Sequence, residues 1–367
     1  MSIELKPILL AKRWAHHTPS GGYDRLCSEV GYPSVFVNKK VNTRIYQNIS
    51  RRLKPRLMPS SRYVNSYGLK DLAGELKVLY KARKFGYTLV HSIYAEDQLN
   101  FLLNYRNKLQ AALVGSFHLP LESAFMQRVI GSGYEKRYAN IDAAMVVSRS
   151  MVHDCEDWLG KGNVFFVPHG IDTKTFHPLK NTSEKFQNSQ LNVLSVGIHG
   201  RDWDTVMEVS SQFANNPQIK FSAIVPNGIR SRFEHHPEIQ LFSGIPEDEL
   251  IAKYRAADVL LIPLKFATAN NSLLESIACG TPVISTNTGG IPDYLTESSG
   301  WMLDIGDIKS IIHLLKVLLD DKSSLIDKSV IARKESLNFD WQKISKHVNE
   351  VYKFTFEKWH REKKPDK

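Results

Sequence analysis

The chain has 367 residues, 42% of them apolar, which is enough to form about two packed domains of ~150 residues each. Its apolar N-terminal run is too short for a signal peptide, and no stretch of about 18 consecutive apolar residues occurs, so we expect no membrane-spanning segment. The three cysteines, Cys27, Cys155 and Cys279, lie far apart, which argues against a disulfide framework or a zinc site and predicts a reducing, cytoplasmic location.

The net charge of +10 is concentrated in one half of the chain. Residues 1–170 hold 24 Lys and Arg against 13 Asp and Glu, whereas residues 171–367 hold 24 against 25. Residues 39–62 contain eight Lys and Arg, no acid, and several apolar side chains. This segment is either a solvated basic loop or a contact for anionic lipid or an anionic acceptor, where each cation contributes about 1 kcal/mol. Nucleic acid is not expected as a partner, because no nucleic-acid-binding motif accompanies the charge.

Short apolar segments rich in β-branched residues alternate with longer helical patterns along the chain. This alternation predicts an α/β fold with two parallel sheets and crossover helices. The predicted strands in chain order are KPILLA, PSVFV, YTLVH, AALVGSF, DAAMVV and NVFFV, followed by LNVLSVG, IKFSAIV, IQLFSG, ADVLLIP and PVIST.

A domain boundary is predicted where Pro168 and Gly170 precede an irregular polar stretch. We therefore expect one domain over residues 1–170 and a second over residues 171–338. The pattern of residues 339–367 predicts one long helix with an apolar face and a frayed tail.

The turn after the first predicted strand has the sequence SGGYDRL and leads into a helix. Gly21 and Gly22, just before Tyr23, would let the backbone approach a ligand and direct free N–H groups at it. Neither G-x-G-x-x-G nor G-x-x-x-x-G-K-[ST] occurs, so the sequence does not indicate a dinucleotide fingerprint or a P-loop.

His118 follows the apolar strand AALVGSF and precedes Pro120, which places its imidazole at the carboxyl end of a predicted strand. Open parallel sheets bind ligands at this edge. His118 is either an ordinary hydrogen-bonding residue or a group that contacts a phosphate or shares a proton, for which its usual pKa of about 6.5 is suited.

In the second half, the strand LNVLSV is followed by a loop with a cation beside a helix N-terminus. Gly197 ends the strand, His199 and Arg201 lie in the loop, and a helix is predicted to begin near Asp202. This is a candidate phosphate site. Alternatively, Arg201 pairs with Asp202 or Asp204 on the surface.

A comparable positive site follows the strand ADVLLIP. Lys265 lies in this loop, and the next helix begins around Asn270, Asn271 and Ser272. Arg201 and Lys265 could therefore contact one diphosphate from two sides.

Glu275 has two interpretations. Ser272 is a suitable N-cap, Glu275 follows three residues later, and Gly280 with Pro282 ends the helix, so the segment fits a capping box. The carboxylate would then accept a hydrogen bond from the N–H of Ser272. Because this helix also opens at the ligand-binding edge of the predicted sheet, Glu275 could instead contact a ligand.

The sequence shows no Ser-His-Asp arrangement, no telling pair of carboxylates and no cluster of metal ligands. The pairs His16–His17 and His235–His236 are expected in loops. What recurs is a strand, a turn and a helix N-terminus, an arrangement suited to holding a phosphorylated leaving group.

Several stretches resemble glycosyltransferase family 4, the retaining GT-B enzymes that use nucleotide-activated sugars. Residues 147–178 are similar to the passage between the two domains of this family, and residues 244–295 resemble its donor-binding core in order and spacing. The segments GSFHLP and SGGYDRL are similar to the family's strand that ends in a histidine and to its N-terminal glycine turn.

The resemblance implies two facing Rossmann-like domains, with the acceptor bound mainly by the first, the nucleotide sugar by the second, and the last helix crossing back. It implies that Glu275 accepts hydrogen bonds from the ribose and that no metal is required. His118 would orient donor or acceptor while the acceptor hydroxyl attacks from the face that the leaving group departs. Together with the candidate phosphate sites above, this gives the predicted donor-binding residues Gly197, His199, Arg201, Lys265, Asn270, Asn271, Ser272 and Glu275, and the first-domain loop residues Gly21, Gly22 and Tyr23. The loop GIHGRDWD differs from the family's usual phosphate loop, so the role of Arg201 is predicted from its position alone.

One position departs from the family pattern. The usual E-x7-E motif has a second acid eight positions before Glu275, where this chain has Ala267. Either Thr268, Asn270 or Asn271 contacts the sugar instead, or the domain binds a nucleotide sugar without turning it over. The expectation is a retaining glycosyltransferase acting on an envelope glycan, a lipid-linked oligosaccharide or another glycoconjugate. The alternatives are a catalytically silent binding module, an inverting transferase or a sugar-nucleotide epimerase.

Overall fold

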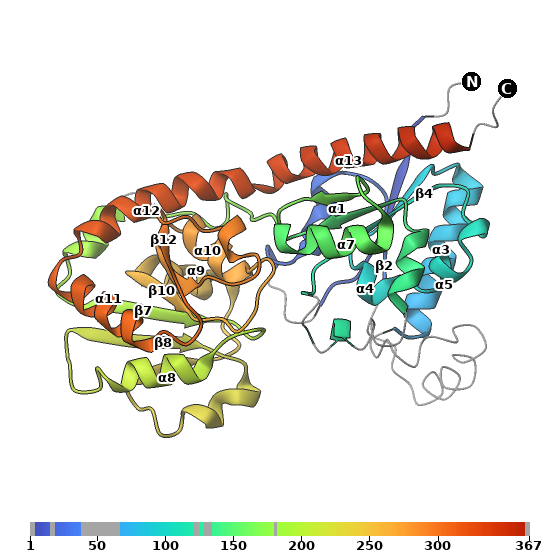
Figure 1. Ribbon diagram of the computed structural model, residues 1–367. Helices are drawn as coiled ribbons and strands as arrows, with labels where there is room; N and C mark the ends of the chain where they lie inside the picture. Colours follow the sequence, from blue (N-terminus) through green and yellow to red (C-terminus); the bar gives the residue numbers. More distant parts are fainter. Residues whose placement is uncertain are drawn as a thin grey trace. The chain divides into compact units, whose positions relative to one another are not determined.

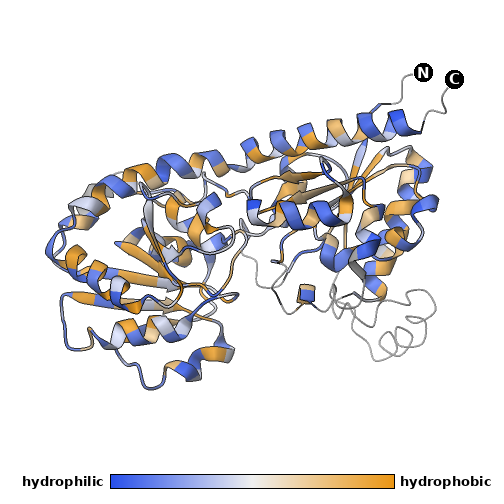
Figure 2. Cartoon of the chain, viewed as in Figure 1, coloured by the Kyte–Doolittle hydropathy of each residue, from blue (hydrophilic) through white to orange (hydrophobic). Residues whose placement is uncertain are grey.

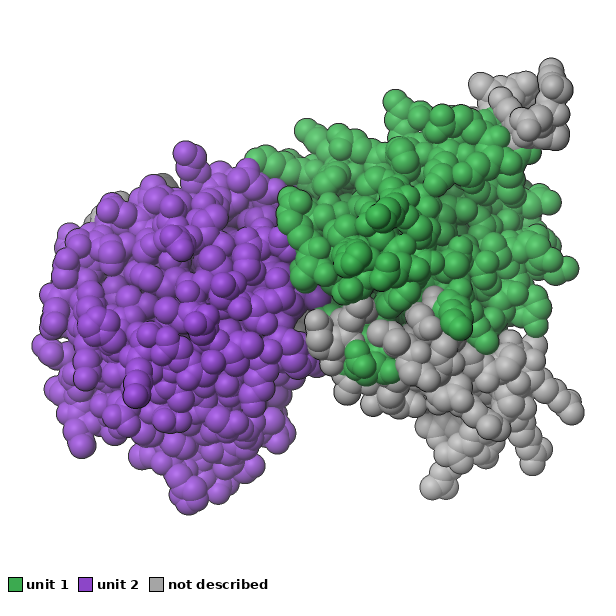
Figure 3. Space-filling view, viewed as in Figure 1, with its two compact units in different colours: residues 1–17, 22–169, 342–367 green, residues 18–21, 170–341 purple. Residues whose placement is uncertain are grey.

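The computed structural model describes residues 4–14, 19–37, 67–120, 123, 125–127, 134–179 and 182–363. The basic segment 39–62 and the pair His16–His17 lie outside these ranges, so what the sequence predicts for them stays a prediction. The described chain belongs to two compact units, coloured separately in Figure 3. The first unit comprises Met1–His17, Gly22–His169 and Gln342–Lys367, and the second comprises Thr18–Gly21 and Gly170–Trp341.

The first unit is built on a parallel sheet in which the described residues form six strands in the order β2-β1-β3-β4-β5-β6. Leu9 of β1 lies opposite Ser34 on one side and His91 on the other. Each strand coincides with a predicted apolar run, with β3 extending one residue beyond it, so the α/β prediction is confirmed for this half. The strands are β1 (Pro7–Ala11), β2 (Ser34–Phe36), β3 (Leu89–Ser92), β4 (Ala112–Phe117), β5 (Ala143–Val146) and β6 (Val164–Phe166).

Helices pack against the strands of the first sheet (Figure 1). Gly74 brings α3 close to β1, because an added Cβ would lie 2.8 Å from Val37 Cγ2 and 3.1 Å from Leu10 Cδ1. The helices are η1 (Tyr23–Arg25), α1 (Leu26–Glu29), α3 (Leu69–Phe85), α4 (Ala95–Gln98), α5 (Phe101–Asn104), η2 (Arg106–Lys108), η3 (Tyr134–Asn140), η4 (Arg149–Met151) and α7 (Val152–Leu159).

The second unit also contains a parallel sheet, with the strand order β12-β11-β10-β7-β8-β9 in the described residues. Five of these strands coincide with predicted apolar runs. The edge strand β12 was not predicted, because its sequence GWML is short and its last three residues are only partly buried. The strands are β7 (Leu191–Val196), β8 (Ile219–Ile224), β9 (Ile239–Phe242), β10 (Val259–Ile262), β11 (Val283–Thr286) and β12 (Gly300–Leu303).

Both faces of the second sheet are covered at β10 and β11, whose residues are all buried, whereas β8 and β9 expose polar side chains (Figure 2). Leu194 and Leu260 face a core that includes α9 and α10, whereas Val193 and Leu261 face a core that includes α8 and α11. The helices of this unit are η5 (Thr182–Gln187), α8 (Trp203–Ser211), η6 (Asn227–Phe233), α9 (Glu247–Ala256), α10 (Asn271–Ala278), η7 (Ile291–Asp293), α11 (Ile308–Asp320), α12 (Ser323–Ser336) and η8 (Leu337–Phe339).

The last helix, α13 (Trp341–Glu362), corresponds to the long helix predicted from residue 339. Its predicted apolar face is confirmed, because Ile344, Val348, Tyr352 and Phe356 are all buried. In the part of the chain that the structure describes, no helix combines the length and the apolar character needed to cross a membrane.

Candidate functional site

Two loops of the second unit are joined at the carboxyl ends of β7 and β10. Asp202 N–H donates to the carbonyl of Pro263 at 2.9 Å, and Lys265 N–H donates to the carbonyl of Gly200, also at 2.9 Å. A bridge between Arg201 and Leu264 lies between these two bonds. The loop after β7 is therefore held against the loop that leads to α10, at the sheet edge where ligands of open α/β folds bind.

Arg201 links these two loops through its guanidinium group. Its Nε donates to the carbonyl of Val196 at 2.6 Å, and Nη1 donates to that of His199 at 3.2 Å. Its Nη2 donates to Asn270 Oδ1 at 3.1 Å and to Ser272 Oγ at 3.0 Å. Burial lowers the pKa of Arg201 to about 10, so the group still carries its charge at neutral pH. The cation is thereby held rigidly at the start of α10.

Gly197 makes room for this arginine. Its φ is +126°, and a Cβ at this position would lie 2.4 Å from Nη2 and 2.6 Å from Cζ of Arg201. Only glycine combines this backbone conformation with such close contact to a side chain. The predicted importance of Gly197 therefore has a steric cause, which is the placement of Arg201.

The helix α10 begins differently from the prediction. Its N-cap is Asn270, with φ of −131° and ψ of 109°, and Asn270 Oδ1 accepts a hydrogen bond from the N–H of Leu273 at 3.1 Å. The predicted N-cap, Ser272, already lies inside the helix, and its hydroxyl accepts from Arg201. Asn271, the first helical residue, is partly exposed. The predicted capping box of Ser272 and Glu275 is therefore wrong.

Glu275 is buried within α10, with a relative exposure of 6%. Its Oε2 accepts a hydrogen bond from the hydroxyl of Tyr254 in α9 at 2.8 Å. Burial raises the pKa of this carboxyl to about 7, although the Tyr254 hydrogen bond and the charge of Arg201 both act to lower it. Tyr254 was missed in the sequence analysis, because nothing local links residues 21 positions apart. Glu275 is thus a buried acid beside a cation, a combination common at functional sites.

Lys265, rather than Arg201, lies close to the carboxylates of Asp202 and Asp204. Its Nζ lies 3.6 Å from Asp202 Oδ1 and 3.7 Å from Asp204 Oδ2, and its side chain is 55% exposed. The alternative in which Arg201 pairs with these acids is wrong, since the carboxylates face Lys265 instead. His199 is exposed in the same loop.

Ala267, the position without the expected acid, is packed against a glycine turn. Its carbonyl accepts a hydrogen bond from the N–H of Gly290 at 3.1 Å, and a Cβ on Gly289 would lie 2.0 Å from that carbonyl. Ala267 and the neighbouring Thr268 are 8% and 7% exposed. At the position where the family pattern has an acidic side chain, Ala267 therefore packs against the backbone of the glycine turn.

The first unit places His118 in an aromatic setting. Its ring centroid lies 4.3 Å from that of Tyr23 and 4.9 Å from that of Tyr94. Gly22, which has a φ of 92°, precedes the short helix that carries Tyr23, and Gly21 is buried. Tyr23 is only 1% exposed. The predicted glycine turn therefore positions an aromatic ring against His118.

Glu96 fixes the backbone at His118 and was not recognised in the sequence. Its Oε1 accepts from the N–H of His118 at 2.7 Å and from that of Leu119 at 3.2 Å, and it lies 3.5 Å from His118 Nδ1. Glu96 is 2% exposed. An acid four residues after an apolar strand could have indicated it, because the carboxyl ends of parallel strands β3 and β4 share one edge of the sheet.

A buried hydrogen-bond chain lies behind this group. Tyr352 Oη in α13 lies 2.6 Å from His91 Nδ1, His91 Nε2 lies 2.8 Å from Ser116 Oγ, and Ser116 Oγ lies 3.3 Å from Tyr23 Oη. Burial lowers the pKa of His91 to about 3, so its imidazole is neutral. The last helix is thereby connected through polar contacts to the ring that packs on His118.

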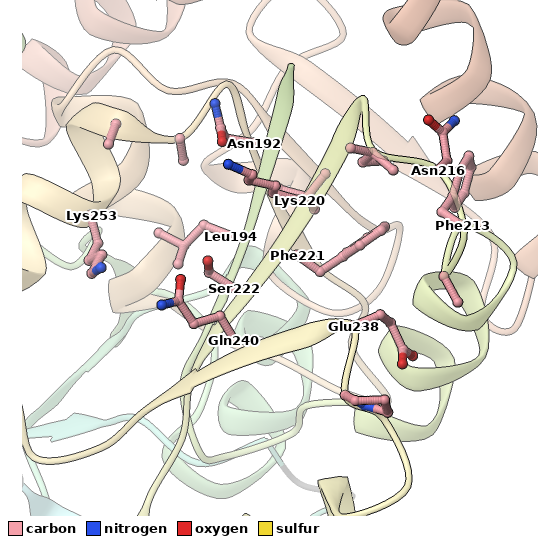
Figure 4. Close-up of a pocket in the computed structure, with 16 residues that line it drawn as sticks. Asn192, Leu194, Phe213, Asn216, Lys220, Phe221, Ser222, Glu238, Gln240 and Lys253 are labelled. Atoms are coloured by element: carbon pink, nitrogen blue, oxygen red, sulfur yellow. The ribbon is translucent and has the colours of Figure 1, made fainter.

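A hollow of about 570 Å³ lies away from the predicted site. It is bordered by the first residues of β7 and β8, at the opposite end of these strands from Gly197. Figure 4 shows Phe213 and Phe221 on one side of the strands and Ser222, Gln240 and Lys253 on the other. None of the predicted site residues lines this hollow.

Two family models match the chain. The model for Glycosyltransferase Family 4 matches residues 38–175, and that for Glycosyl transferases group 1 matches residues 214–321. The chain belongs to glycosyltransferase family 4. The first of these matches contains His118. The second contains Lys265 and Glu275 but begins after Arg201.

Comparisons with whole proteins agree with this family. The chain is 25% identical over 213 residues to the sulfoquinovosyl transferase SQD2 of Arabidopsis thaliana, which covers 53% of the chain and 41% of SQD2. The chain thus matches about two fifths of that relative's length. Among solved structures, sucrose-phosphate synthase from Thermosynechococcus elongatus has a TM-score of 0.72 at 17% identity, covering 96% of this chain and 100% of that one. Anabaena HepE, solved with UDP-glucose, has a TM-score of 0.70 at 11% identity over 96% and 100% of the two chains. At these identities the structural likeness shows the fold, which is GT-B.

Proposed function

We propose that this protein is a retaining glycosyltransferase that moves a sugar from a nucleoside-diphosphate donor to a hydroxyl of a glycan, a lipid-linked oligosaccharide or another glycoconjugate. The biological setting that we propose is envelope or exopolysaccharide synthesis. Family membership supports the transferase class, and the UDP-glucose bound to HepE supports a nucleotide sugar as donor.

The observation that carries the proposal is the buried carboxylate of Glu275 beside Arg201 at the start of α10. A ribose offers two adjacent hydroxyl donors, and an ionised carboxylate accepts such hydrogen bonds strongly. Glu275 Oε2 already accepts from Tyr254, which leaves Oε1 and the second lone pair of Oε2 for the ribose.

The same region suits a diphosphate. An α-helix leaves its first N–H groups without helical acceptors, and these attract anions. Arg201 and Lys265 add positive charge, although Lys265 must exchange its contacts with Asp202 and Asp204 for the phosphate. In the proposed reaction the bond from the anomeric carbon to the diphosphate oxygen breaks, and these groups stabilise the charge on the departing oxygen.

The acceptor hydroxyl then bonds to the anomeric carbon on the same face, and its proton passes to the departing phosphate oxygen. We propose that His118 orients donor or acceptor and that no metal takes part. Glu96 and Tyr23 support this role, because they fix the backbone and the ring of His118. Asn270, Asn271, Thr268 and His199 remain proposed donor contacts by their sequence positions.

A thermal unfolding panel tests this function. Wild-type protein and the variant Glu275→Ala are unfolded with UDP, GDP, ADP and their sugar conjugates, with the exposed Glu234→Ala as a matched control. A ligand at a hundred times its Kd stabilises by ~2.7 kcal/mol, which raises Tm by several degrees. We expect one nucleotide family to stabilise the wild type and the control, but not Glu275→Ala. No stabilisation by any compound would count against the donor site.

Ala267 favours a second candidate, a GT-B module that binds a nucleotide sugar without turnover. Measured turnover that Glu275→Ala abolishes would reject this candidate. Product stereochemistry then separates the proposed retaining transferase from an inverting transferase, and release of a free isomerised nucleotide sugar would indicate an epimerase.

We further propose a cytoplasmic location with peripheral association at the inner face of the membrane. The three free cysteines support a reducing compartment. The basic residues 39–62 support the association, because their charge complements anionic lipid.

A further inference from the structure

The helix α3 exposes three large apolar side chains, two of which lie next to each other on one face. Leu76, Tyr80 and Phe85 are 43%, 57% and 49% exposed, while Val78 and Ala82 of the same helix are buried. Leu76 and Tyr80 are four residues apart and therefore lie one turn from each other on the same face. Adjacent exposed apolar side chains of this size mark interaction surfaces more often than scattered ones do.

Cations surround these apolar side chains. Residues 76–85 include Lys77, Lys81, Arg83 and Lys84 and no acid. Lys84 Nζ lies 5.4 Å from the ring centroid of Tyr80 and 5.5 Å from that of Phe85. The charged and aromatic groups of this helix thus form one mixed surface rather than separate patches.

This surface also contains a hollow. A hollow of about 400 Å³ is bordered by Leu76, Leu79, Tyr80, Arg83 and Lys84. Arg83 is held in place, because its Nε and Nη2 donate to the carbonyl of Lys108 at 3.1 and 2.7 Å. The lysines Lys77 and Lys84 are exposed.

The helix α12 provides a useful contrast. It also exposes apolar side chains, with Ile326 at 40% and Val330 at 65%. However, Asp327 lies between them in sequence, and Glu335 follows on the same helix. Its charge is therefore mixed, whereas the charge around the apolar side chains of α3 has one sign.

We propose that the outward face of α3 docks on an anionic lipid membrane. Leu76 and Tyr80 would enter the boundary between headgroups and acyl chains, and the lysines would contact lipid phosphates. Lysine suits this geometry because its aliphatic stem stays among apolar groups while the ammonium reaches the phosphate layer. An acidic protein would match the charge but would not account for the exposed apolar pair Leu76 and Tyr80 on one face. The inference does not depend on the proposed transfer reaction, and it concerns a different surface from residues 39–62.

Binding of the full chain to vesicles tests the proposal. The wild type is sedimented with vesicles of phosphatidylcholine alone and with vesicles that contain phosphatidylserine. We expect the anionic vesicles to be preferred. Both Leu76→Ser with Tyr80→Ser and Lys77→Glu with Lys84→Glu should lower the partition coefficient by at least about tenfold, and Ile326→Ser with Val330→Ser should leave it unchanged. All substituted side chains are exposed, so circular dichroism should show unchanged folding.

Three results would overturn the assignment. Equal binding to neutral and anionic vesicles would remove the electrostatic part. Unchanged binding of both α3 variants, together with loss of binding on charge reversal of Arg51, Arg52, Lys54 and Arg56, would assign the membrane contact to the basic segment instead. Concentration-dependent dimerisation that the α3 variants abolish, without vesicle binding, would identify a second copy of the chain as the occupant.

Discussion

Burial opposes ionisation of the Glu275 carboxyl group. Its partners within the unit are the hydroxyl of Tyr254 and the nearby charge of Arg201, and together they do not offset the cost of burial, since the pKa remains at about 7. A neutral amide would accept the same hydrogen bond from Tyr254 without that cost. A carboxyl group that is buried at such a cost in free energy is typical of a ligand-binding group.

Glu275→Gln should therefore be more stable than the wild type at pH 8 and equally stable at pH 4. Below the unfolded pKa of 4.5 both states hold the proton. Between pH 4.5 and 7 the unfolded chain releases it while the folded chain keeps it, so wild-type stability falls as the pH rises. The difference in unfolding free energy at pH 8 is at most about 3.5 kcal/mol, since one pH unit of pKa difference corresponds to about 1.4 kcal/mol.

Urea unfolding of both proteins at several pH values measures this difference. Glu234→Gln is the matched control, because its side chain is exposed and should show no such trend. A wild type that is more stable than Glu275→Gln at pH 8 would mean that the carboxylate is stabilised in the folded state. The stability gain should be accompanied by loss of nucleotide binding if the proposed role of Glu275 is correct.

Local patterns indicated Arg201 and Glu275 as residues of interest but could not indicate their partners. Asn270 and Ser272 lie 69 and 71 positions from Arg201, and these contacts depend on the loops after β7 and β10 meeting. Apart from the edge strand β12, the strands were predictable, because apolar runs bounded by turns leave few alternatives. The contacts of Arg201 with Asn270 and Ser272 were not predictable, because they depend on which strands become neighbours in the sheet.

At the scale of the element, α10 shows how a distant contact selects between two local possibilities. Asn and Ser are comparably good N-cap residues, so local preference does not separate Asn270 from Ser272. Asn270 itself has an extended conformation, and Arg201 donates hydrogen bonds to the side chains of both Asn270 and Ser272. The helix therefore begins two residues earlier than its capping-box pattern predicts.

Asn270→Ala should destabilise the protein by about 1 kcal/mol or more, because it removes the acceptor for the N–H of Leu273 and one acceptor for Arg201. Ser272→Ala should have a smaller effect, since Ser272 caps no amide in this helix. Urea unfolding of the two variants gives the comparison. A larger loss for Ser272→Ala would support the sequence-based capping box over the observed one.

At the scale of the whole molecule, each unit has its own parallel sheet and its own core. The last helix completes the first unit, because its buried face includes Tyr352, which is hydrogen-bonded to His91 of β3. The second unit carries the proposed donor site. A substitution that disturbs one core should therefore destabilise mainly the unit that contains that core.

Tyr352→Phe tests this independence. The substitution keeps the ring but leaves His91 Nδ1 without its hydroxyl partner, and a buried polar atom left in this way costs about 1–3 kcal/mol. Because the pKa of His91 is lowered to about 3 by burial, protonation of the ring cannot compensate at neutral pH. We expect hydrogen exchange to become faster in β1, β3, β4 and α13 and to stay unchanged in β7 to β12.

The control Tyr105→Phe alters a ring that is 38% exposed and should change the exchange rates of neither set of elements. Faster exchange in both sheets would show that the two units unfold as one cooperative body, and a shift in the nucleotide-induced stabilisation would then be expected from substitutions in either unit.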